Sequence, residues 1–285
     1  MMKKSNMIRN VLLYVMLSIV LLIFLGPYIW MFMTSVKTQG DVMAWPPKII
    51  PTEYYWENFL RIWQETNLPR AFFNSFVVSV LATLINVFLS SLAAFAFARL
   101  RFPGRDKLFM MVLATMMIPT GLMVVPLFFM MKNVPFAGPD GLLDSYAGLI
   151  LPFAVTGFAI FLMRQNFLSV PRELDEQATI DGCSKFQIYW RIILPLNKPA
   201  IALVTIFSFL SHWNEYLWPL TIARSQEMYT VQIALKAFQG QYNIDWPLIM
   251  AGATTAALPM IILYFILQPL FEQGLGGLGT GGKET

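Results

Sequence analysis

Six long apolar segments, separated by short polar ones, dominate the chain. They are 11–36, 71–98, 108–131, 145–163, 199–223 and 246–271. A helix needs about 20 apolar residues to cross the hydrocarbon core of a bilayer. The fourth segment is the shortest, and Glu215 interrupts the fifth. The pattern predicts an all-α polytopic membrane protein with six transmembrane helices.

The first apolar segment is interpreted as a span and not as a secretory leader. Its run of apolar residues exceeds the roughly 7–15 residues of a leader core, and no small-residue cleavage site precedes Lys37. The chain is treated as a single transmembrane domain over 1–285. Within it, 1–70 holds the first span and an outer loop, 71–271 the core spans two to six, and 272–285 a glycine-rich tail.

Composition supports a membrane protein and narrows its chemistry. The chain is 57% hydrophobic and 13% charged, with a mean hydropathy of +0.60, whereas soluble domains are about 25% charged. The single cysteine, Cys183, excludes a disulfide within one chain and any cysteine-based metal cluster. The net charge of +4 follows from the membrane topology, so it is no sign of nucleic-acid binding.

The basic residues indicate the orientation. An even number of spans places both termini on one side, and cytoplasmic loops carry an excess of Lys and Arg. With the termini inside, only seven of the 20 basic residues lie outside: Lys37, Lys48, Arg61, Arg70, Lys132, Arg224 and Lys236. The connection between spans two and three decides the matter, because it packs Arg99, Arg101, Arg105 and Lys107 into nine positions.

A polar passage at 171–195, between spans four and five, is therefore cytoplasmic. Pro171 suits a first helical turn, and the acids that follow it suit the positive end of the helix dipole. Leu174 and Ala178 share one face of this helix, and Gly182 ends it.

A second short helix is expected after Gly182. Ser184 and Gln187 form a predicted capping box, and Pro195 is expected to stop the helix. Its expected apolar positions are Phe186, Tyr189, Trp190 and Ile193. A helix–turn–helix held between two spans is suited to docking on a cytosolic partner.

This passage resembles the EAA loop of ABC importer membrane subunits. The family pattern is E-A-A, three residues, G, nine residues, I-x-L-P, and the spacing is reproduced, except that Gln177 stands where alanine is usual. The matching residues are Glu176, Ala178, Gly182, Ile192, Leu194 and Pro195. An ordinary amphipathic cytoplasmic loop is the competing interpretation.

Further segments resemble the carbohydrate-uptake, maltose-type permeases, specifically their smaller six-span subunit. The similar segments are GPYIWMFMTSVK (26–37), IPTGLMVVPLF (118–128), GLILP (148–152), WNEYLWPL (213–220) and QPLFEQG (268–274). The resemblance implies a type I ABC importer permease fold in a prokaryotic inner membrane. It also implies three partners: a second permease subunit, a cytoplasmic ATPase dimer and an extracytoplasmic substrate-binding protein.

The resemblance further implies how such a subunit works. The first short helix of the loop sits in a cleft of the ATPase and transmits its closure. The residues assigned to this coupling are Glu173, Glu176, Ala178, Asp181, Gly182, Ile192, Leu194 and Pro195. ATP and Mg²⁺ belong to the partner ATPase, and this chain is expected to hold no cofactor and no metal.

The tail GLGTGGKE (277–284) is close to a phosphate-binding loop but does not match it. Glu284 replaces the hydroxyl that would hold Mg²⁺, and no strand precedes the segment. A contact with the ATPase, as the family's glycine-rich tail makes, and a flexible linker both remain open.

Polar residues within the spans are candidates for a translocation pathway. Span two carries Ser75, Ser79, Thr83, Asn86 and Ser90 at helical spacing, which is also how membrane helices pack. In span five, Glu215 near the outer end and His212 share a face with serines, and helix packing is again the alternative. The residues assigned to the pathway are Ser79, Thr83, Asn86, Ser208, Ser211, Asn214 and Glu215.

Pro119, Pro126, Pro152 and Pro259 are expected to kink their spans. The outer aromatics Tyr54, Tyr55 and Trp56 are expected at the lipid interface or against a partner.

Two other functions compete with that of a transport subunit for a sugar or sugar derivative. A membrane enzyme acting on lipid-linked sugars needs clustered acids, His or Cys at the membrane face, and the only acidic cluster lies in the 171–195 loop. An ion-coupled secondary transporter calls for intramembrane charges and internal repeats, but only Glu215 is present and no repeat is evident. The sequence does not tell which sugar is carried.

Overall fold

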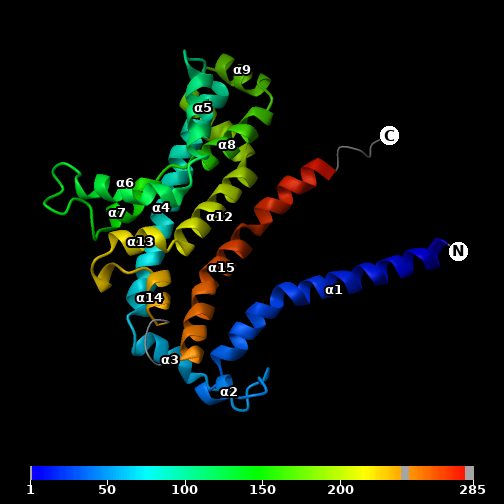
Figure 1. Ribbon diagram of the computed structural model, residues 1–285. Coiled ribbons are helices and arrows are strands. Elements are labelled where there is room, and N and C mark those ends of the chain that lie inside the picture. Colours follow the sequence, from blue (N-terminus) through cyan, green and yellow to red (C-terminus); the bar gives the residue numbers. More distant parts are fainter. Residues whose placement is uncertain (1, 239–243, 280–285) are drawn as a thin grey trace. The chain divides into compact units, whose positions relative to one another are not determined.

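The computed structural model describes residues 2–238 and 244–279, which are helical and contain no strand (Figure 1). Side chains are described except for those of 2–6, 8 and 271–279. The chain forms two compact units. Unit 1 comprises Met1–Pro69 with Leu235–Leu258, and unit 2 comprises Arg70–Ala234 with Pro259–Thr285.

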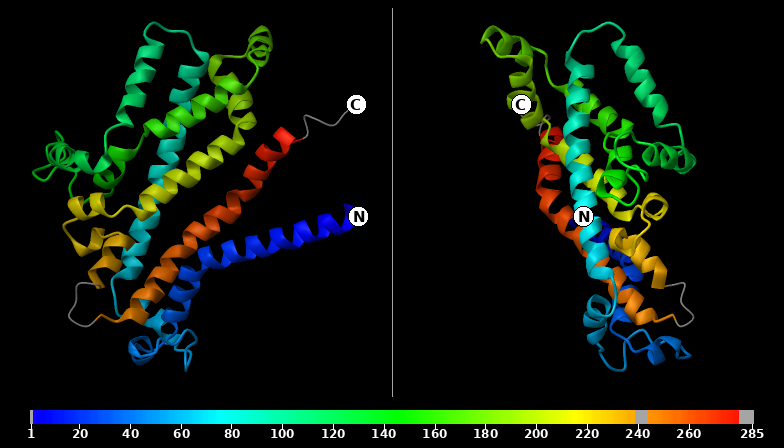
Figure 2. Two further views of the ribbon diagram at one scale, coloured as in Figure 1. Left: turned by 45° about the vertical axis from the view of Figure 1, so that its right-hand side comes forward. Right: turned by 90° about the vertical axis from the view of Figure 1, so that its left-hand side faces the viewer.

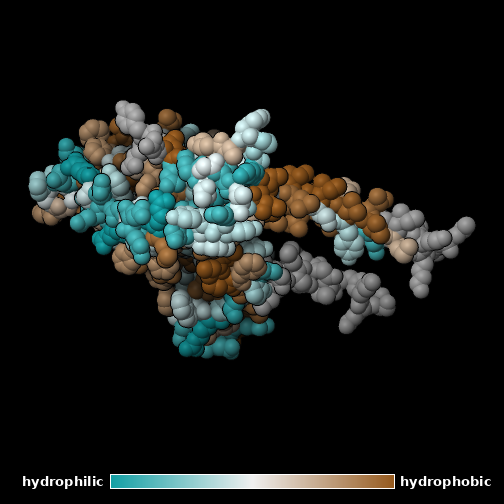
Figure 3. Space-filling model, turned by 90° about the horizontal axis from the view of Figure 1, so that it is seen from below, coloured by the Kyte–Doolittle hydropathy of each residue, from teal (hydrophilic) through white to brown (hydrophobic). Residues whose placement is uncertain are grey.

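Three helices are long and apolar enough to span a membrane, as predicted. They are α1 (Met2–Ser35), α4 (Leu68–Arg99) and α15 (Trp246–Gly279). Figure 3 shows an almost unbroken hydrophobic surface along α1, as expected for a helix that contacts lipid. Helix α15 continues into the predicted tail as far as Gly279, and 280–285 lie outside the described residues.

The other predicted spans are bent, so the described residues hold up to six spans if each bent pair counts as one. Helices α5 (Arg105–Thr115) and α6 (Thr120–Lys132) meet at 101°. The pair formed by α7 (Tyr146–Ile150) with η1 (Leu151–Phe153) and by α8 (Gly157–Ser169) meets at 47°.

A proline lies at or near each break. Pro119 is the N-cap of α6, at the first break, and supplies no backbone N–H to the preceding turn. Pro152 lies in η1, ahead of the second break at 154–156. Pro126 and Pro259 lie inside α6 and α15.

The fifth predicted span is shorter than expected. Helix α12 (Lys198–Asn214) ends before Glu215, whose backbone is extended, and α13 (Leu217–Ile222) is a separate short helix. The Oε1 atom of Glu215 accepts hydrogen bonds from the backbone N–H groups of Leu217 (3.0 Å) and Trp218 (3.2 Å). The acid that interrupts the apolar run thus starts a new helix by satisfying its first N–H groups.

Unit 1 is held together by polar contacts around the end of α1. It also holds α2 (Gln39–Met43), α3 (Glu57–Gln64) and the start of α15. The Asn58 amide donates to the carbonyls of Ser35 and Lys37, both at 2.9 Å, and Arg61 lies 3.3 Å from the Asp245 carboxylate. Lys37 is buried and donates to the Lys48 carbonyl, and burial lowers the pKa of its ammonium group. The outer aromatics Tyr54, Tyr55 and Trp56 are exposed.

Two hydrophobic cores lie along α4 in the described part of unit 2. One includes Ala94 and Phe95 of α4 and residues of α8 and α12. The other includes Val78 and Ala82 of α4 and residues of α7 and α13. Unit 2 also holds η3 (Gln226–Met228) and the first part of α14 (Val231–Ala237). Helices α4, α8 and α12 lie side by side in both figures (Figures 1 and 2), and Asn86 falls between the two cores along α4.

Candidate translocation site and coupling element

The 171–195 passage forms the predicted helix, glycine turn and second helix. Helix α9 (Glu173–Ile180) has three acids in its first turn. Gly182 adopts φ +81°, the left-handed region that glycine favours, and the Cys183 N–H bonds the Ala178 carbonyl at 2.9 Å. The predicted capping box is confirmed, because Ser184 and Gln187 each accept a hydrogen bond from the other's backbone N–H.

The second helix ends at Leu196, one residue beyond Pro195. It runs from α10 (Lys185–Ile188) through the π-helical η2 (Tyr189–Ile193) and α11 (Leu194–Leu196), and bends by 81° before α12. The Leu194 N–H bonds the Tyr189 carbonyl, five residues back. This wider turn lets the helix pass a proline that supplies no N–H.

The predicted apolar face of the second helix is half right. Tyr189 and Ile193 are buried together with Ile188, whereas Phe186 and Trp190 are 61% and 56% exposed.

The assigned coupling residues divide between surface and core. Ala178 is buried in the core that also contains Ala94 and Phe95, and Ile192 and Leu194 are half-buried. The exposed members are Glu173, Glu176, Asp181, Gly182 and Pro195. Helix α9 lies at the same end of unit 2 as the turn between α4 and α5 (Figures 1 and 2).

An ion pair between Arg99 and Asp175 fastens α9 to α4, and the sequence analysis did not identify it. The Arg99 side chain is 3% exposed, and its Nε lies 3.4 Å from the Asp175 carboxylate. The guanidinium also donates to the Phe167 and Val170 carbonyls, both at 2.7 Å. One side chain thereby joins the ends of α4 and α8 to α9.

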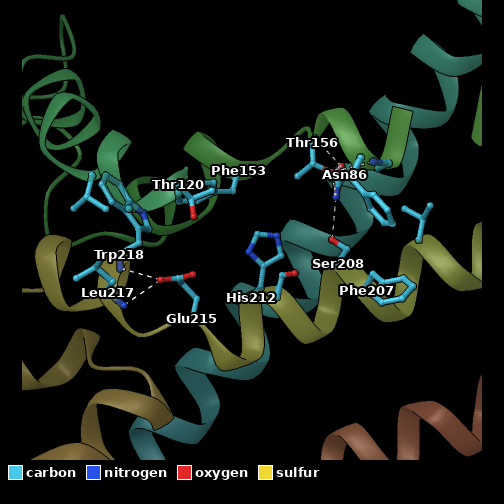
Figure 4. Close-up of a pocket in the computed structure, with 16 residues that line it drawn as sticks. Asn86, Thr120, Phe153, Thr156, Phe207, Ser208, His212, Glu215, Leu217 and Trp218 are labelled. Atoms are coloured by element: carbon cyan, nitrogen blue, oxygen red, sulfur yellow. Dashed lines mark hydrogen bonds between the residues drawn. The ribbon is translucent and has the colours of Figure 1, made fainter. Parts of the chain in front are cut away.

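A cavity of about 370 Å³ lies in unit 2, where α4, α6, α8, α12 and α13 meet (Figure 4). Four of the residues assigned to the pathway line it: Asn86, Ser208, Ser211 and Glu215. The other three do not. Ser79 and Thr83 are buried in α4 away from the cavity, and Asn214 is exposed at the end of α12.

Asn86 is the polar hub of the cavity. Its amide nitrogen donates to the Ser208 hydroxyl (3.1 Å) and to the Thr156 hydroxyl (3.3 Å). Its amide oxygen accepts from the Thr156 N–H (3.1 Å) and from the Ser90 hydroxyl (2.8 Å). A buried amide with every partner in place fixes α4, α8 and α12 against one another.

At the other side of the cavity, the His212 ring and the Glu215 carboxylate point into the space, as Figure 4 shows. Aromatic rings complete the wall. Phe158 and Phe207 meet edge to face at 5.6 Å, and Phe153 does the same with Trp218 at 5.7 Å. Such a mixture of apolar walls and a few placed polar groups is typical of small-molecule sites.

Several lining residues were not predicted, namely Thr120, Phe153, Thr156, Phe207 and Trp218. Thr156 lies in the break between η1 and α8, and Thr120 follows the break between α5 and α6. The prolines beside both breaks were the available signal. Among the described residues, no group of His, Cys, Asp and Glu could hold a metal ion.

Comparison with known proteins identifies the family. Residues 86–277 match the model of the binding-protein-dependent transport system inner membrane component. The chain belongs to this family. It is a multi-pass protein of the bacterial inner membrane and a permease subunit of an ABC importer, so it is a transport component and not an enzyme.

Relatives cover almost the whole permease. It is 34% identical over 274 residues to the arabinooligosaccharides transport system permease protein AraQ of Bacillus subtilis, covering 95% of this chain and 94% of the relative. It is 33% identical to the sn-glycerol-3-phosphate transport system permease protein UgpE of Escherichia coli, covering 92% and 94%.

A solved structure confirms the fold. One chain of a bacterial ABC transporter involved in the import of the acidic polysaccharide alginate matches with a TM-score of 0.81 and 26% identity. The match covers 94% of this chain and 98% of that chain. The all-α ABC importer permease fold expected from the sequence is therefore correct.

Proposed function

We propose that this permease carries a sugar or sugar derivative through the cavity of unit 2, and that the 171–195 element drives the change of access. A second permease subunit completes the pathway, and an ATPase dimer binds α9 from the cytoplasm. A substrate-binding protein delivers cargo to the outer loops, including 221–246, of which 239–243 lie outside the described residues.

One observation carries the proposal: the coupling element and the cavity share core residues. Ala159 of α8 and Val204 of α12 line the cavity. Both also belong to the hydrophobic core that contains Ala178 of α9 and Tyr189 of η2. Protein cores are close-packed and transmit displacement, so a movement of α9 is passed to the cavity wall through this shared core.

The surface of the element supplies the matching contact for an ATPase. Glu173, Glu176 and Asp181 are exposed acids, suited to pair with basic side chains of a partner. Beside them, Ile180 is 85% exposed, an apolar side chain that a docked partner would cover.

The test is ATP-driven uptake and ATP hydrolysis, measured side by side in proteoliposomes that contain the complete transporter. We expect Glu176→Lys and Gly182→Asp to abolish uptake while the subunit still inserts and assembles. Glu176→Gln is the control for side-chain size. Gly182→Asn is the control for backbone strain, since Asn and Asp both tolerate the left-handed conformation and no atom lies within 4 Å of a Cβ at Gly182. Normal uptake by both charged variants would contradict the proposal.

A further inference from the structure

The charge of the cavity indicates which class of cargo it accepts. The two relatives and the solved structure handle cargo of both kinds: an arabinooligosaccharide is neutral, whereas glycerol 3-phosphate and alginate are anionic. Membership of the family therefore does not decide the charge of the cargo, and the residues of the cavity have to be considered by themselves.

The lining holds one carboxylate and no lysine or arginine. Its charged member is Glu215, and its other polar side chains are the neutral groups of Asn86, Thr120, Thr156, Ser208 and Ser211, with the imidazole of His212. Phosphate and carboxylate ligands are bound in proteins by Arg, Lys or runs of free backbone N–H groups. The cavity offers neither Arg nor Lys, and the N–H groups at the start of α13 are already bonded to Glu215. The first turns of α6 and α8 contribute backbone N–H groups to the lining, but a helix N-terminus carries only a partial positive charge. Glu215 is therefore the one full charge among the described lining residues.

The position of Glu215 makes an anion unfavourable. One of its oxygens bonds the start of α13, and the carboxylate faces the cavity beside His212 (Figure 4). An anionic cargo would stand next to a like charge in a space with apolar walls, where charges are weakly screened. A sugar hydroxyl, by contrast, can donate to this carboxylate in a charge-assisted hydrogen bond.

The remaining walls suit a neutral sugar. Sugar rings present hydroxyl edges and apolar C–H faces, and the cavity lining combines the Phe158 and Phe207 rings with the polar groups of Glu215 and Ser211. Its volume of about 370 Å³ falls within the range of small-molecule sites, roughly 300–1,000 Å³.

We infer that the cavity is a subsite for an uncharged oligosaccharide and that Glu215 excludes phosphorylated and uronic-acid sugars. This inference rests on the proposed function of the cavity as the translocation site. Glu215 acts twice, as a hydrogen-bond acceptor for sugar hydroxyls and as a fixed negative charge.

The electrostatic part is tested at a thiol placed in the cavity. Ser211 lines the cavity and is exposed, so Ser211→Cys is made in a Cys183→Ser chain and the assembled transporter is treated with anionic and cationic methanethiosulfonate reagents. Rates are normalised to those with a free small thiol. We expect the anionic reagent to react at least about tenfold more slowly than the cationic one. Adding Glu215→Gln, which keeps an acceptor oxygen, should bring the ratio of the anionic to the cationic reaction rate close to one. Equal normalised rates, or faster reaction of the anion, would overturn the inference.

The cargo part is tested with a defined panel in proteoliposomes that contain the complete transporter and its binding protein. The neutral probes are arabinotriose and lactose, and the anionic probes are sn-glycerol 3-phosphate and a mannuronate disaccharide. ATP-driven uptake confined to neutral probes supports the inference. ATP-driven uptake of an anionic probe overturns it and leaves the proposed function intact. Uptake that does not depend on ATP contradicts the proposed function itself. The ratio of the two reagents' reaction rates at Ser211→Cys still reports the charge of the cavity in that case.

Discussion

At the scale of single residues, the Arg99–Asp175 ion pair is a polar contact that joins α4 to α9. A buried arginine that loses its carboxylate leaves an uncompensated charge, which typically costs about 3–5 kcal/mol. The Phe167 and Val170 carbonyls still solvate Arg99, so we expect Asp175→Asn to lower the free energy of unfolding by about 2 kcal/mol. Thermal unfolding of the purified transporter measures this.

Glu173→Gln is the matched control for that experiment. Glu173 lies in the same first turn of α9 and is exposed, with no ion pair among the described residues. Exposed charges contribute little to stability, so its melting temperature should stay close to that of the wild type. An Asp175→Asn variant as stable as this control would show that the ion pair does not hold α9 in place.

Asn86 offers a second prediction at this scale, on the shape of the cavity. Asn86→Asp keeps the size of the side chain but removes the amide donor to Ser208 and Thr156 and adds a buried charge. We expect a loss of about 2–3 kcal/mol of stability. Ser91→Ala is the comparison: its hydroxyl donates to a carbonyl of its own helix and lies 2.7 Å from the Tyr189 hydroxyl, so it should cost less. An equal loss of stability in both variants would mean that the hydrogen bonds of Asn86 contribute no more than those of Ser91.

At the scale of elements, the second helix of the coupling passage depends on its cap. Ser184→Ala removes the acceptor for the Gln187 N–H, and loss of such a cap costs about 0.5–2 kcal/mol. Hydrogen exchange of the amides that follow Ser184 should speed up accordingly. Ser169→Ala is the control, because that hydroxyl donates to the Asn166 carbonyl and caps no N–H group. Unchanged exchange in Ser184→Ala would show that packing alone holds α10.

The elements also show what the sequence can and cannot predict. The capping box and the Gly182 turn were predictable because their partners lie within five residues along the chain. The π turn before Pro195 was missed, since several ways of passing a proline have similar energies and packing selects one. Arg99 and Asp175, or Asn86 and Thr156, are far apart in the sequence, so their pairing depends on how helices pack. Ser79 and Thr83 were assigned to the pathway by helical period alone, and they do not line the cavity. The period does not say how a helix packs against its neighbours.

At the scale of the whole molecule, the predicted orientation in the membrane rests on the distribution of the basic residues and is open to a direct test. The chain has one cysteine, Cys183, in the turn after α9. We expect a membrane-impermeant maleimide to label it in inverted vesicles and not in intact spheroplasts. Moving the thiol to the outer loop, with Cys183→Ser and Glu53→Cys, should reverse the result. Labelling of Cys183 from outside would show that the topology is the opposite one, with α9 on the side of the membrane away from the ATPase.

Glu215 also restricts how this permease can change its cargo in evolution or in the laboratory. The residue that sets the charge of the cavity is the same one that satisfies the first N–H groups of α13. Most substitutions that remove the charge also leave those N–H groups without a partner and loosen Trp218, a core residue. Glutamine is among the few single replacements that separate the two roles. A shift to acidic cargo would therefore pass most easily through a neutral glutamine intermediate, with cations gained later at other positions of the wall.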